Sequence, residues 1–580
     1  MKLSTFTPYT KSFRKAFLII PFFVVIDVFC EIVQPRLMSI IVDDGILHKD
    51  INYILKIGLA MIGLAIVAIV ANLCNIYYSA HASVGFATNL RTALFRKIQS
   101  FAFADTDYFS SASLTTRLTN DTNMMQQVMM MCLRMLLRAP LMMVFAIIFA
   151  VSINKDLSIV MAIALPILAL SIFILLRKGL PFFIKMQQAV DRVNSVVQEN
   201  LLNVRVVKAF VRQDFEKKKF DKVNFDLMDV ATKASSIVVL IMPVMQLVMG
   251  LSLVAVTWFG GQKVMTGTLA LGGLMSFLSY ITQILISLML LSLTFMMISR
   301  AIASGDRIEE VLEKQPSLSD TVEGLQNRDA ITAGRIAFQQ VTFRYNKQSA
   351  KPNLDNISFD VKPASTLAII GGTGSGKSTL VQLIPRLYDV SEGSVLVDGI
   401  DVRNYQLQEL RSEIAIVLQQ NQLFSGTILE NLKWGNEQAT DEDIYAAART
   451  ACADDFIRSF PAGYHTLLGQ GGVNVSGGQK QRIRIARALL KKPKILIMDD
   501  STSAVDIDTD RKIREGLKNY LQDTTQLIIA QRISSVMHAD QILVMEEGRI
   551  VGSGSHEVLL QTNTIYQEIY QSQHLQKEEA

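Results

Sequence analysis

The chain has 580 residues, of which 50% are hydrophobic and 19% are charged, and its formal net charge is +5. That length suggests two to four domains, and the charged fraction lies below the globular norm of about 25%. The composition excludes a disordered protein, a collagen and a small disulfide scaffold, and the charge excess is too small to indicate nucleic-acid binding. It favours a membrane protein with a soluble part.

Six apolar runs precede residue 300, and a helix needs about 20 such residues to cross the hydrocarbon core. Four of the runs contain no charge: 57–80, 157–176, 235–261 and 269–299. The other two, 16–42 and 127–153, are apolar but carry a few charged residues. We therefore predict six membrane-spanning helices in a transmembrane domain over residues 1–302.

Basic residues are concentrated in the N-terminal segment and in the loops after the second and fourth spans, whereas the alternate loops are short and poor in Lys and Arg. The positive-inside rule then places both termini and the C-terminal half in the cytoplasm of a multi-pass plasma-membrane protein. A cleaved signal peptide is not expected. Because span one begins near residue 16, an N-terminal peptidase domain is not expected either.

The two basic loops are long, about 45 and nearly 60 residues, and they show helical periodicity. We interpret them as extensions of the membrane helices into the cytoplasm. The candidate turns between these extensions are 103–114 and 203–215, and such turns could contact a soluble domain and transmit motion.

Charged residues inside the predicted spans are the candidates for a substrate pathway. Asp27 and Glu31 are four residues apart on span one, and Arg134 and Arg138 are four apart at the start of span three. Intramembrane charges are costly and usually pair or face an interior. Structural pairing or interior lining is favoured, and contact with a cationic substrate is the alternative.

Residues 303–333 are predicted to be a linker, and residues 334–580 an α/β nucleotide-binding domain. A short apolar strand, 366–370, leads into G-x-x-x-x-G-K-S and then into a helix-like segment, 379–384. In that context the motif is a P-loop, whose glycines let backbone N–H groups and a helix N-terminus surround phosphate oxygens. The predicted ATP-binding residues are Gly371, Gly372, Thr373, Gly374, Ser375, Gly376, Lys377, Ser378 and Thr379.

A second apolar strand, 494–498, ends at Asp499 in the Walker B pattern. A buried parallel strand delivers such a carboxylate beside the phosphate loop. Asp499 and Ser378 are therefore the predicted ligands of Mg²⁺.

Between these motifs lies Val475-Ser476-Gly477-Gly478-Gln479, the signature sequence of the ABC ATPases in nearly standard form. The chain resembles ABC exporters over essentially its whole length. The resemblance implies that Tyr345 stacks on adenine, that Gln419 in the Q-loop contributes to catalysis and Mg²⁺ binding, and that Ser503-Ala504-Val505-Asp506 is a D-loop. It also implies a half-transporter in membrane lipid that works with a second chain, whose bound ATP contacts Ser476, Gly477, Gly478 and Gln479.

Two positions depart from the exporter pattern. Asp500 stands where the catalytic Glu is usual, and Gln531 stands where the switch His is usual. Misplacing a reacting group by about 1 Å can cost about a hundredfold in rate. The resemblance is therefore to the degenerate-site subunit of bacterial heterodimeric multidrug exporters, with a partner that supplies Glu and His. A homodimeric exporter is the alternative.

The substrate is expected to be a hydrophobic or amphipathic small molecule, exported by alternating access. The methionine-rich entry to span three suits adaptable apolar binding, although ordinary packing explains it better. A lipid flippase, a peptide exporter and a regulatory membrane protein that binds ATP without transport are the other classes considered.

Overall fold

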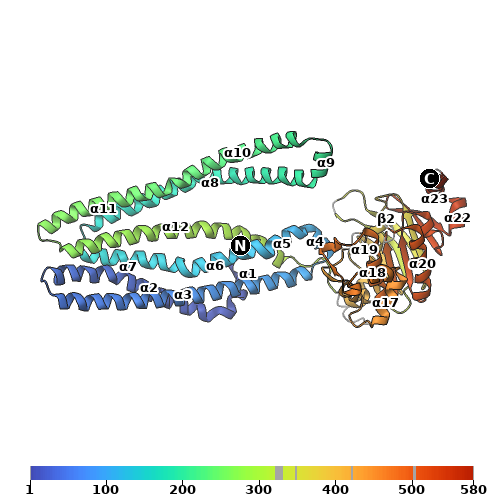
Figure 1. Ribbon diagram of the computed structural model, residues 1–580, viewed down its shortest axis with the longest axis horizontal. Helices are drawn as coiled ribbons and strands as arrows, with labels where there is room; N and C mark the ends of the chain where they lie inside the picture. Colours follow the sequence, from blue (N-terminus) through green and yellow to red (C-terminus); the bar gives the residue numbers. More distant parts are fainter. Residues whose placement is uncertain (1, 321–330, 347–348, 420–421, 501–504, 579–580) are drawn as a thin grey trace. The chain divides into compact units, whose positions relative to one another are not determined.

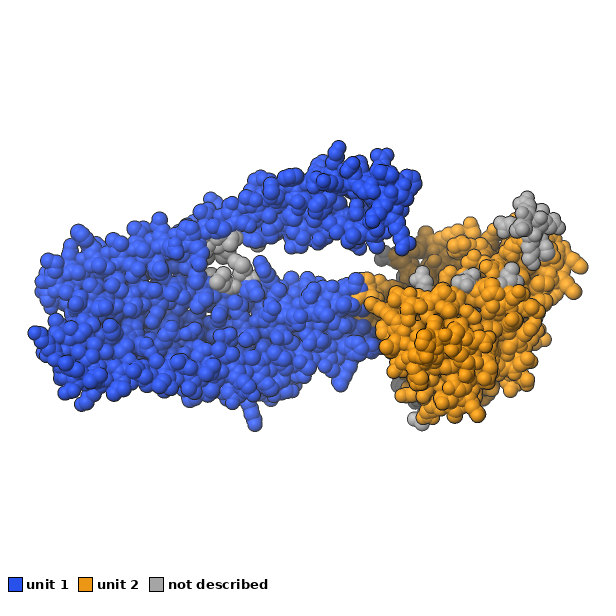
Figure 2. Space-filling view, in the orientation of Figure 1, with its two compact units in different colours: residues 1–99, 112–314 blue, residues 100–111, 315–580 orange. Residues whose placement is uncertain are grey.

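The structure is a computed structural model that describes residues 2–320, 331–346, 349–419, 422–500 and 505–578 (Figure 1). The chain forms two compact units, coloured separately in Figure 2. The first contains residues 1–99 and 112–314, and the second contains residues 100–111 and 315–580. The second unit thus includes a short segment that lies between two membrane helices in the sequence.

The first unit is all helical, and six of its helical stretches are long and apolar enough to cross a membrane. They are Ser4–Ile46, Ile51–Gln99, Ser111–Ile153, Ser158–Leu202, Gln213–Met265 and Leu271–Leu291. The six predicted spans are confirmed in number and order. Their exposed flanks are apolar, as expected for helices whose outer surface meets lipid instead of water.

Several of these helices run far beyond the length that a membrane requires. Helix α3 (Ile51–Gln99) has 49 residues and α8 (Ser158–Leu202) has 45, against the roughly 20 needed to cross. Helix α10 (Gln213–Val239) packs along α8, and the short helix α9 (Val204–Ala209) joins them at the tip (Figure 1). The predicted helical extensions and the turn within 203–215 match this arrangement.

The core of the first unit is formed by α2 (Arg14–Ile40), α7 (Leu137–Ile153), α11 (Ile241–Met265) and α12 (Leu271–Glu313) together with α3 and α8. Tyr280 on α12 is fully buried there and donates a hydrogen bond to the carbonyl of Ile32, 2.9 Å away. A polar hydrogen at this depth needs such a partner, because no water is available to it.

The predicted linker begins too early, because α12 continues to Glu313. The polar composition after residue 300 suggested a linker, but Ile308 and Val311 are fully buried one helical turn apart. Spacing of three residues keeps both on one face, so packing extends the helix. Residues 321–330 of the predicted linker lie outside the described residues.

The third span contains a π-helical turn, Cys132–Leu136, directly before α7. Pro140 in α7 has no N–H and cannot donate to the carbonyl four residues earlier. Such a lost bond is a common cause of a local π-helical turn. Arg134 lies inside this turn, and Arg138 lies after it in α7.

The second unit is built on a six-stranded sheet in the order β12-β11-β3-β10-β9-β6, parallel except for the β11–β12 pair. Its strands are β3 (Thr366–Gly371), β6 (Ile414–Val417), β9 (Ile495–Asp499), β10 (Thr525–Ile529), β11 (Gln541–Glu546) and β12 (Arg549–Gly554). β10 lies between β3 and β9, so the segments that follow these three strands meet at one edge of the sheet.

A second, four-stranded antiparallel sheet has the order β2-β1-β4-β5. It contains β1 (Ile336–Phe343), β2 (Leu354–Val361), β4 (Glu392–Val397) and β5 (Ile400–Asp401). A six-span helical domain is therefore followed by an α/β P-loop domain, and the predicted fold class is confirmed.

Candidate functional site

The phosphate loop connects β3 to α14 (Lys377–Gln382). Its glycines allow conformations and approaches that a side chain would prevent. Gly376 has φ 94°, and a Cβ on Gly371 would lie 2.1 Å from the carbonyl oxygen of Met545. The loop borders a cavity of about 670 Å³ that is lined by residues 374–379 among others. The helix begins two residues before the predicted 379–384, which places Lys377 and Ser378 in its first turn.

Lys377 and Asp499 face each other across this loop. The Lys377 Nζ donates to the carbonyls of Gly371 (2.9 Å) and Gly372 (2.6 Å), and burial lowers its pKa. Burial chiefly, together with the neighbouring Asp500 charge, raises the pKa of Asp499. The charged forms of both groups would be stabilised by a bound anion and a bound cation respectively.

Asp499 is the last residue of β9, one residue later than the predicted strand end. Its Oδ1 accepts a hydrogen bond from the Ser378 hydroxyl at 3.0 Å. A hydroxyl and a carboxylate oxygen in contact beside a phosphate loop suit a hard cation such as Mg²⁺. The residues present therefore fit Mg–ATP, although no group of three or more His, Cys, Asp or Glu residues suited to a metal occurs among the described residues.

Asp500 is held by two side-chain amides. Its Oδ2 accepts from Gln419 Nε2 at 3.3 Å and from Gln531 Nε2 at 3.2 Å. Asp500 is only 9% exposed, and its φ of 48° lies in the left-handed region. The two positions that depart from the exporter pattern are thus in contact, and the Q-loop residue joins them.

A residue that the sequence did not single out holds the switch segment. Gln573 lies on α23 (Thr564–Glu578), and its Nε2 donates to the Gln531 carbonyl at 2.8 Å. Its Oε1 accepts from the Ile533 backbone N–H, also at 2.8 Å. One amide therefore bridges the two peptide groups on either side of Arg532, the residue after Gln531. No local sequence signal points to this contact, because 42 residues separate Gln573 from Gln531.

Tyr345 lies at the edge of the phosphate loop and is 48% exposed. Its hydroxyl is 3.2 Å from Thr379 Oγ1, and its ring meets the ring of Tyr388 edge-on at 5.2 Å between centroids. The ring is thus exposed beside the loop, and its stacking on adenine stays a prediction.

Tyr388 also contacts the segment that is inserted between two membrane helices. Its hydroxyl donates to Asp107 Oδ2 at 2.8 Å, and its ring packs against Phe103 at 6.2 Å between centroids. Both partners belong to α4 (Phe103–Phe109), inside the predicted turn 103–114. Asp105 of the same helix accepts from the Ser317 backbone N–H at 2.8 Å. Two polar contacts and one ring contact thus tie α4 to the α/β unit, and Tyr388 itself meets the Tyr345 ring beside the phosphate loop.

The signature forms the start of α19 (Gly477–Leu490) and makes reciprocal local hydrogen bonds. Ser476 Oγ accepts from the Gln479 N–H at 3.3 Å, and Gln479 Oε1 accepts from the Ser476 N–H at 2.9 Å. This capping box leaves Gly477 exposed and Gly478 half-buried at the N-terminus of a 14-residue helix. In the D-loop, Asp506 caps the next helix by accepting from the Thr509 N–H, whereas Ser503 and Ala504 lie outside the described residues.

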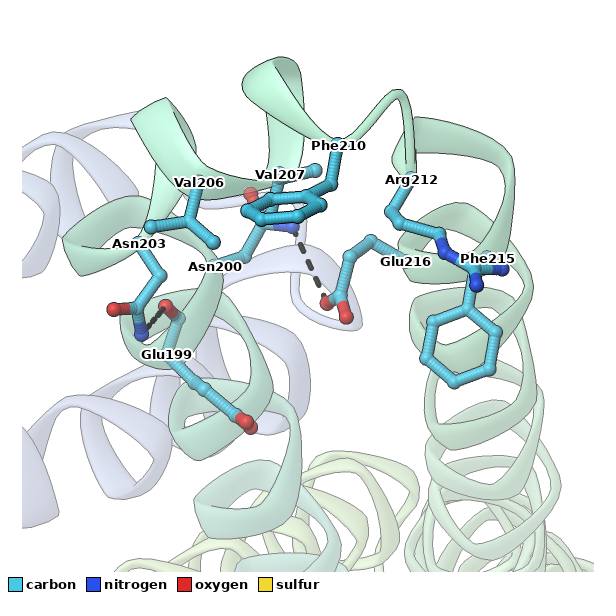
Figure 3. A pocket seen from close by; sticks show the side chains of 9 residues that line it. All are labelled: Glu199, Asn200, Asn203, Val206, Val207, Phe210, Arg212, Phe215 and Glu216. Atoms are coloured by element: carbon cyan, nitrogen blue, oxygen red, sulfur yellow. Dashed lines mark hydrogen bonds between the residues drawn. The ribbon is translucent and has the colours of Figure 1, made fainter.

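The tip formed by α9 carries an exposed apolar surface. Phe210 is 72% exposed and Val211 is 79% exposed. A cavity of about 570 Å³ opens beside them, where Phe210 and Val206 face Asn200 and Glu216 (Figure 3). Asn200 Nδ2 donates to Glu216 Oε2 at 3.3 Å and so joins α8 to α10. Large exposed side chains at the end of a helical arm are typical of a protein-contact surface.

The intramembrane charges form one cluster. Arg138 Nη2 donates to Glu31 Oε2 at 2.6 Å, and Arg138 Nε lies 3.2 Å from Asp27 Oδ2. Asn72 Nδ2 donates to Asp27 Oδ2 at 3.4 Å. Arg134 makes no ion pair with any of the described residues. Pairing of Asp27 and Glu31 with Arg138 is therefore observed, whereas pairing of either carboxylate with Arg134 is not.

Comparison with known proteins identifies the family to which the chain belongs. The family model described as the ABC transporter transmembrane region matches residues 17–289, and the model described as ABC transporter matches residues 354–503. Among curated proteins, the uncharacterized ABC transporter ATP-binding protein YfiB of Bacillus subtilis is 43% identical over 543 residues, or 94% of each chain. Its counterpart Rv1273c of Mycobacterium tuberculosis is 37% identical over 99% of each chain.

A third relative, a fatty acid ABC transporter ATP-binding/permease protein of Mycobacterium bovis, is 34% identical over 82% of this chain and 75% of its own. A solved structure of a bacterial Atm1-family ABC exporter with ATP bound matches 97% of this chain with a TM-score of 0.80 and 24% identity, and it shows the shared fold. The chain belongs to the ABC transporter family. It is an exporter half-transporter that binds ATP, and its ATPase domain drives transport across the membrane.

Proposed function

We propose that this chain is the degenerate-site half of a heterodimeric exporter for hydrophobic or amphipathic compounds. Half-transporters of the family dimerise, and two such domains share two ATP sites. The partner would carry Glu and His where this chain has Asp500 and Gln531. The N-terminus and the α/β unit would then lie in the cytoplasm of a plasma-membrane protein, as the distribution of basic residues predicts.

The observation that carries this proposal is the shared acceptor on Asp500. Gln419 and Gln531 both donate to Oδ2 of its carboxylate. A general base must bring a free lone pair to within about 3 Å of the water that it polarises. Asp500 is one methylene shorter than Glu, and one of its oxygens already accepts two amide hydrogens. Hydrolysis at the site built on this chain's own Walker motifs should therefore be slow.

The signature supports a different role for the opposite site. Ser476 and the backbone N–H groups of Gly477 and Gly478 start a long helix, an arrangement suited to binding phosphate oxygens. Lys377, Ser378 and Asp499 would hold Mg–ATP at the site on this chain. When Mg²⁺ is bound there, it neutralises charge on the phosphates. Tyr345 would position the base.

The exposed tip at α9 supports assembly with a second subunit. Phe210 and Val211 would be buried against the partner's ATPase domain, and α4 already contacts the domain of its own chain through Tyr388 and Asp107. Closure of the two domains around ATP would then move both helical arms. Such coupling of a ligand to a two-state membrane domain is alternating access.

The test compares two substitutions in the complex of this chain with a partner that has Glu and His. Ser476→Ala should reduce ATPase activity at least about tenfold, because it damages the competent site. Asp500→Asn should reduce it by less than about threefold. Ser459→Ala, an exposed serine of the same domain, is the matched control. Equal losses from Ser476→Ala and Asp500→Asn, or full activity of this chain alone, would instead indicate a homodimer with two working sites.

A lipid-like substrate is the second candidate. The relative from Mycobacterium bovis carries the name of a fatty acid transporter and is 34% identical to this chain. Stimulation of ATPase activity by fatty acids, with none by amphipathic cations or neutral hydrophobic compounds, would favour that candidate over a multidrug exporter.

A further inference from the structure

A small cavity opens beside the intramembrane charge cluster in the first unit. Its volume is about 120 Å³, and it lies among α2, α7 and α12. Glu31, Arg138 and Gln283 bring polar atoms to it, and Ser287 adds a hydroxyl that already donates to the Gln283 carbonyl at 2.8 Å. The rest of the lining is apolar: Met135, Ala139, Met142, Ile286 and Leu290.

The charges at this cavity do not balance. Asp27 and Glu31 contribute two carboxylates, and Arg138 is the one cation that pairs with them among the described residues. The Arg138–Asp27 contact is an ion pair whose Nε makes no hydrogen bond. The two carboxylates thus share one paired guanidinium, at a depth where a charge without its own partner is expensive.

Gln283, which lines the same cavity, carries an unsatisfied acceptor. Gln283 Oε1 is shielded from solvent and receives no hydrogen bond from any described residue. Leaving such an acceptor unpaired costs free energy, and a donor brought by a ligand would remove that cost. The side chain of Glu31 is 38% exposed and meets Arg138 through Oε2, so it offers carboxylate surface to a ligand.

We propose that this cavity binds the protonated amino group of an amphipathic amine, with its alkyl part against the methionine and aliphatic side chains. This inference rests on the proposed export of amphipathic compounds and names the substrate class. An ammonium head supplies the missing positive charge and also the N–H donor that Gln283 Oε1 lacks. An anionic head is disfavoured, because both carboxylates would repel it and Arg138 is already occupied.

The experiment measures binding of radiolabelled octylammonium to the full chain in lipid nanodiscs without nucleotide, with empty nanodiscs as the background. Two competitors complete the set. Octyltrimethylammonium has the charge without an N–H donor, and octanoate has the opposite charge. We expect octylammonium to bind most tightly, octyltrimethylammonium about three- to tenfold more weakly, and octanoate not to compete.

Two variants separate charge from hydrogen bonding. Glu31→Gln should weaken both cations about tenfold or more, because it removes the excess charge. Gln283→Met keeps the side-chain length and should weaken octylammonium to the level of octyltrimethylammonium, whose own affinity should not change. Glu442→Gln, on the exposed surface of the ATPase domain, is the matched control and should bind as the unchanged chain does.

The outcomes that overturn the proposal are distinct. Octanoate binding that Glu31→Gln strengthens would assign the cavity to an anion. Unchanged cation binding in both variants, or no saturable binding at all, would remove the site. ATP-driven flux of the same probe by the complex is measured separately. Cation binding without flux would leave the site standing and refute export, whereas flux of another substrate without cation binding would refute the site alone.

Discussion

The side-chain amide of Gln573 bridges the backbone of the switch segment, donating to the Gln531 carbonyl and accepting from the Ile533 N–H at 2.8 Å each. Gln531 in turn donates from its own side chain to Asp500. A residue near the C-terminus of the chain therefore helps to set where the switch residue points.

Gln573→Met should weaken ATP binding by the full chain about two- to tenfold, because two hydrogen bonds of ordinary strength are lost. Fluorescent-ATP titration measures the affinity. Gln573→Glu keeps the acceptor for the Ile533 N–H but places a carboxylate against the Gln531 carbonyl. This variant should bind ATP at least as weakly as Gln573→Met. Gln571→Met, two residues earlier and exposed, is the control. If Gln573 acts through Gln531, its substitution should have no further effect in a Gln531→Ala background.

Tyr388→Phe should reduce the stimulation of ATPase activity by transported compounds about two- to tenfold. The change removes the hydroxyl that donates to Asp107 while keeping the ring against Tyr345. Asp107→Asn should give a similar loss, and the double variant should lose no more than either single one, as expected when two residues act through one contact. Fully additive losses would show that the Tyr388–Asp107 contact does not transmit the stimulation of ATPase activity.

Asp499 predicts a Mg²⁺-dependent response of stability to pH. Burial raises its pKa in the folded chain, so between the ordinary value, about 4, and the raised value the unfolded chain binds fewer protons. Without Mg²⁺, stability should therefore fall as pH rises through that window. Added Mg²⁺ should reverse the fall, because it stabilises the ionised carboxylate. Thermal unfolding of the full chain measures both effects. Asp499→Asn should abolish this dependence of stability on pH, and Asp508→Asn, on the surface, should keep it.

Ile308→Ala should lower the free energy of unfolding by about 2–4 kcal/mol, because it opens a cavity at a fully buried position near the end of α12. Ile302 lies on the same helix and is 43% exposed. Its replacement by Ala should cost about 1 kcal/mol or less. Equal losses of unfolding free energy from the two substitutions would mean that the burial of Ile308 adds no stability.

Local patterns were sufficient for much of this architecture. Uncharged runs of more than 20 residues predict spans because lipid leaves few other solutions. The strand, glycine loop and helix around Lys377 are contiguous, so the sequence carries the whole phosphate site. Family order identified Gln419, Asp500 and Gln531 as motif positions, but only the folded sheet shows that their side chains meet.

The features that were missed depend on contacts or on a single backbone defect. The π-helical turn Cys132–Leu136 before Pro140 was not predicted, because the spacing argument assumed a regular α-helix. The end of α12 is fixed by burial of Ile308 and Val311. Gln573 has no motif of its own, and only the folded chain brings it to the switch.

The exposed aromatic and aliphatic tip at Phe210 and Val211 has a consequence for how the cell makes this transporter. A subunit synthesised without its partner keeps that surface in water, where chaperones and membrane proteases recognise it. Surplus copies should be degraded until subunit numbers match. In the heterodimer proposed above, abundance of this half would be set by the scarcer of the two chains, and matched synthesis of both would be favoured.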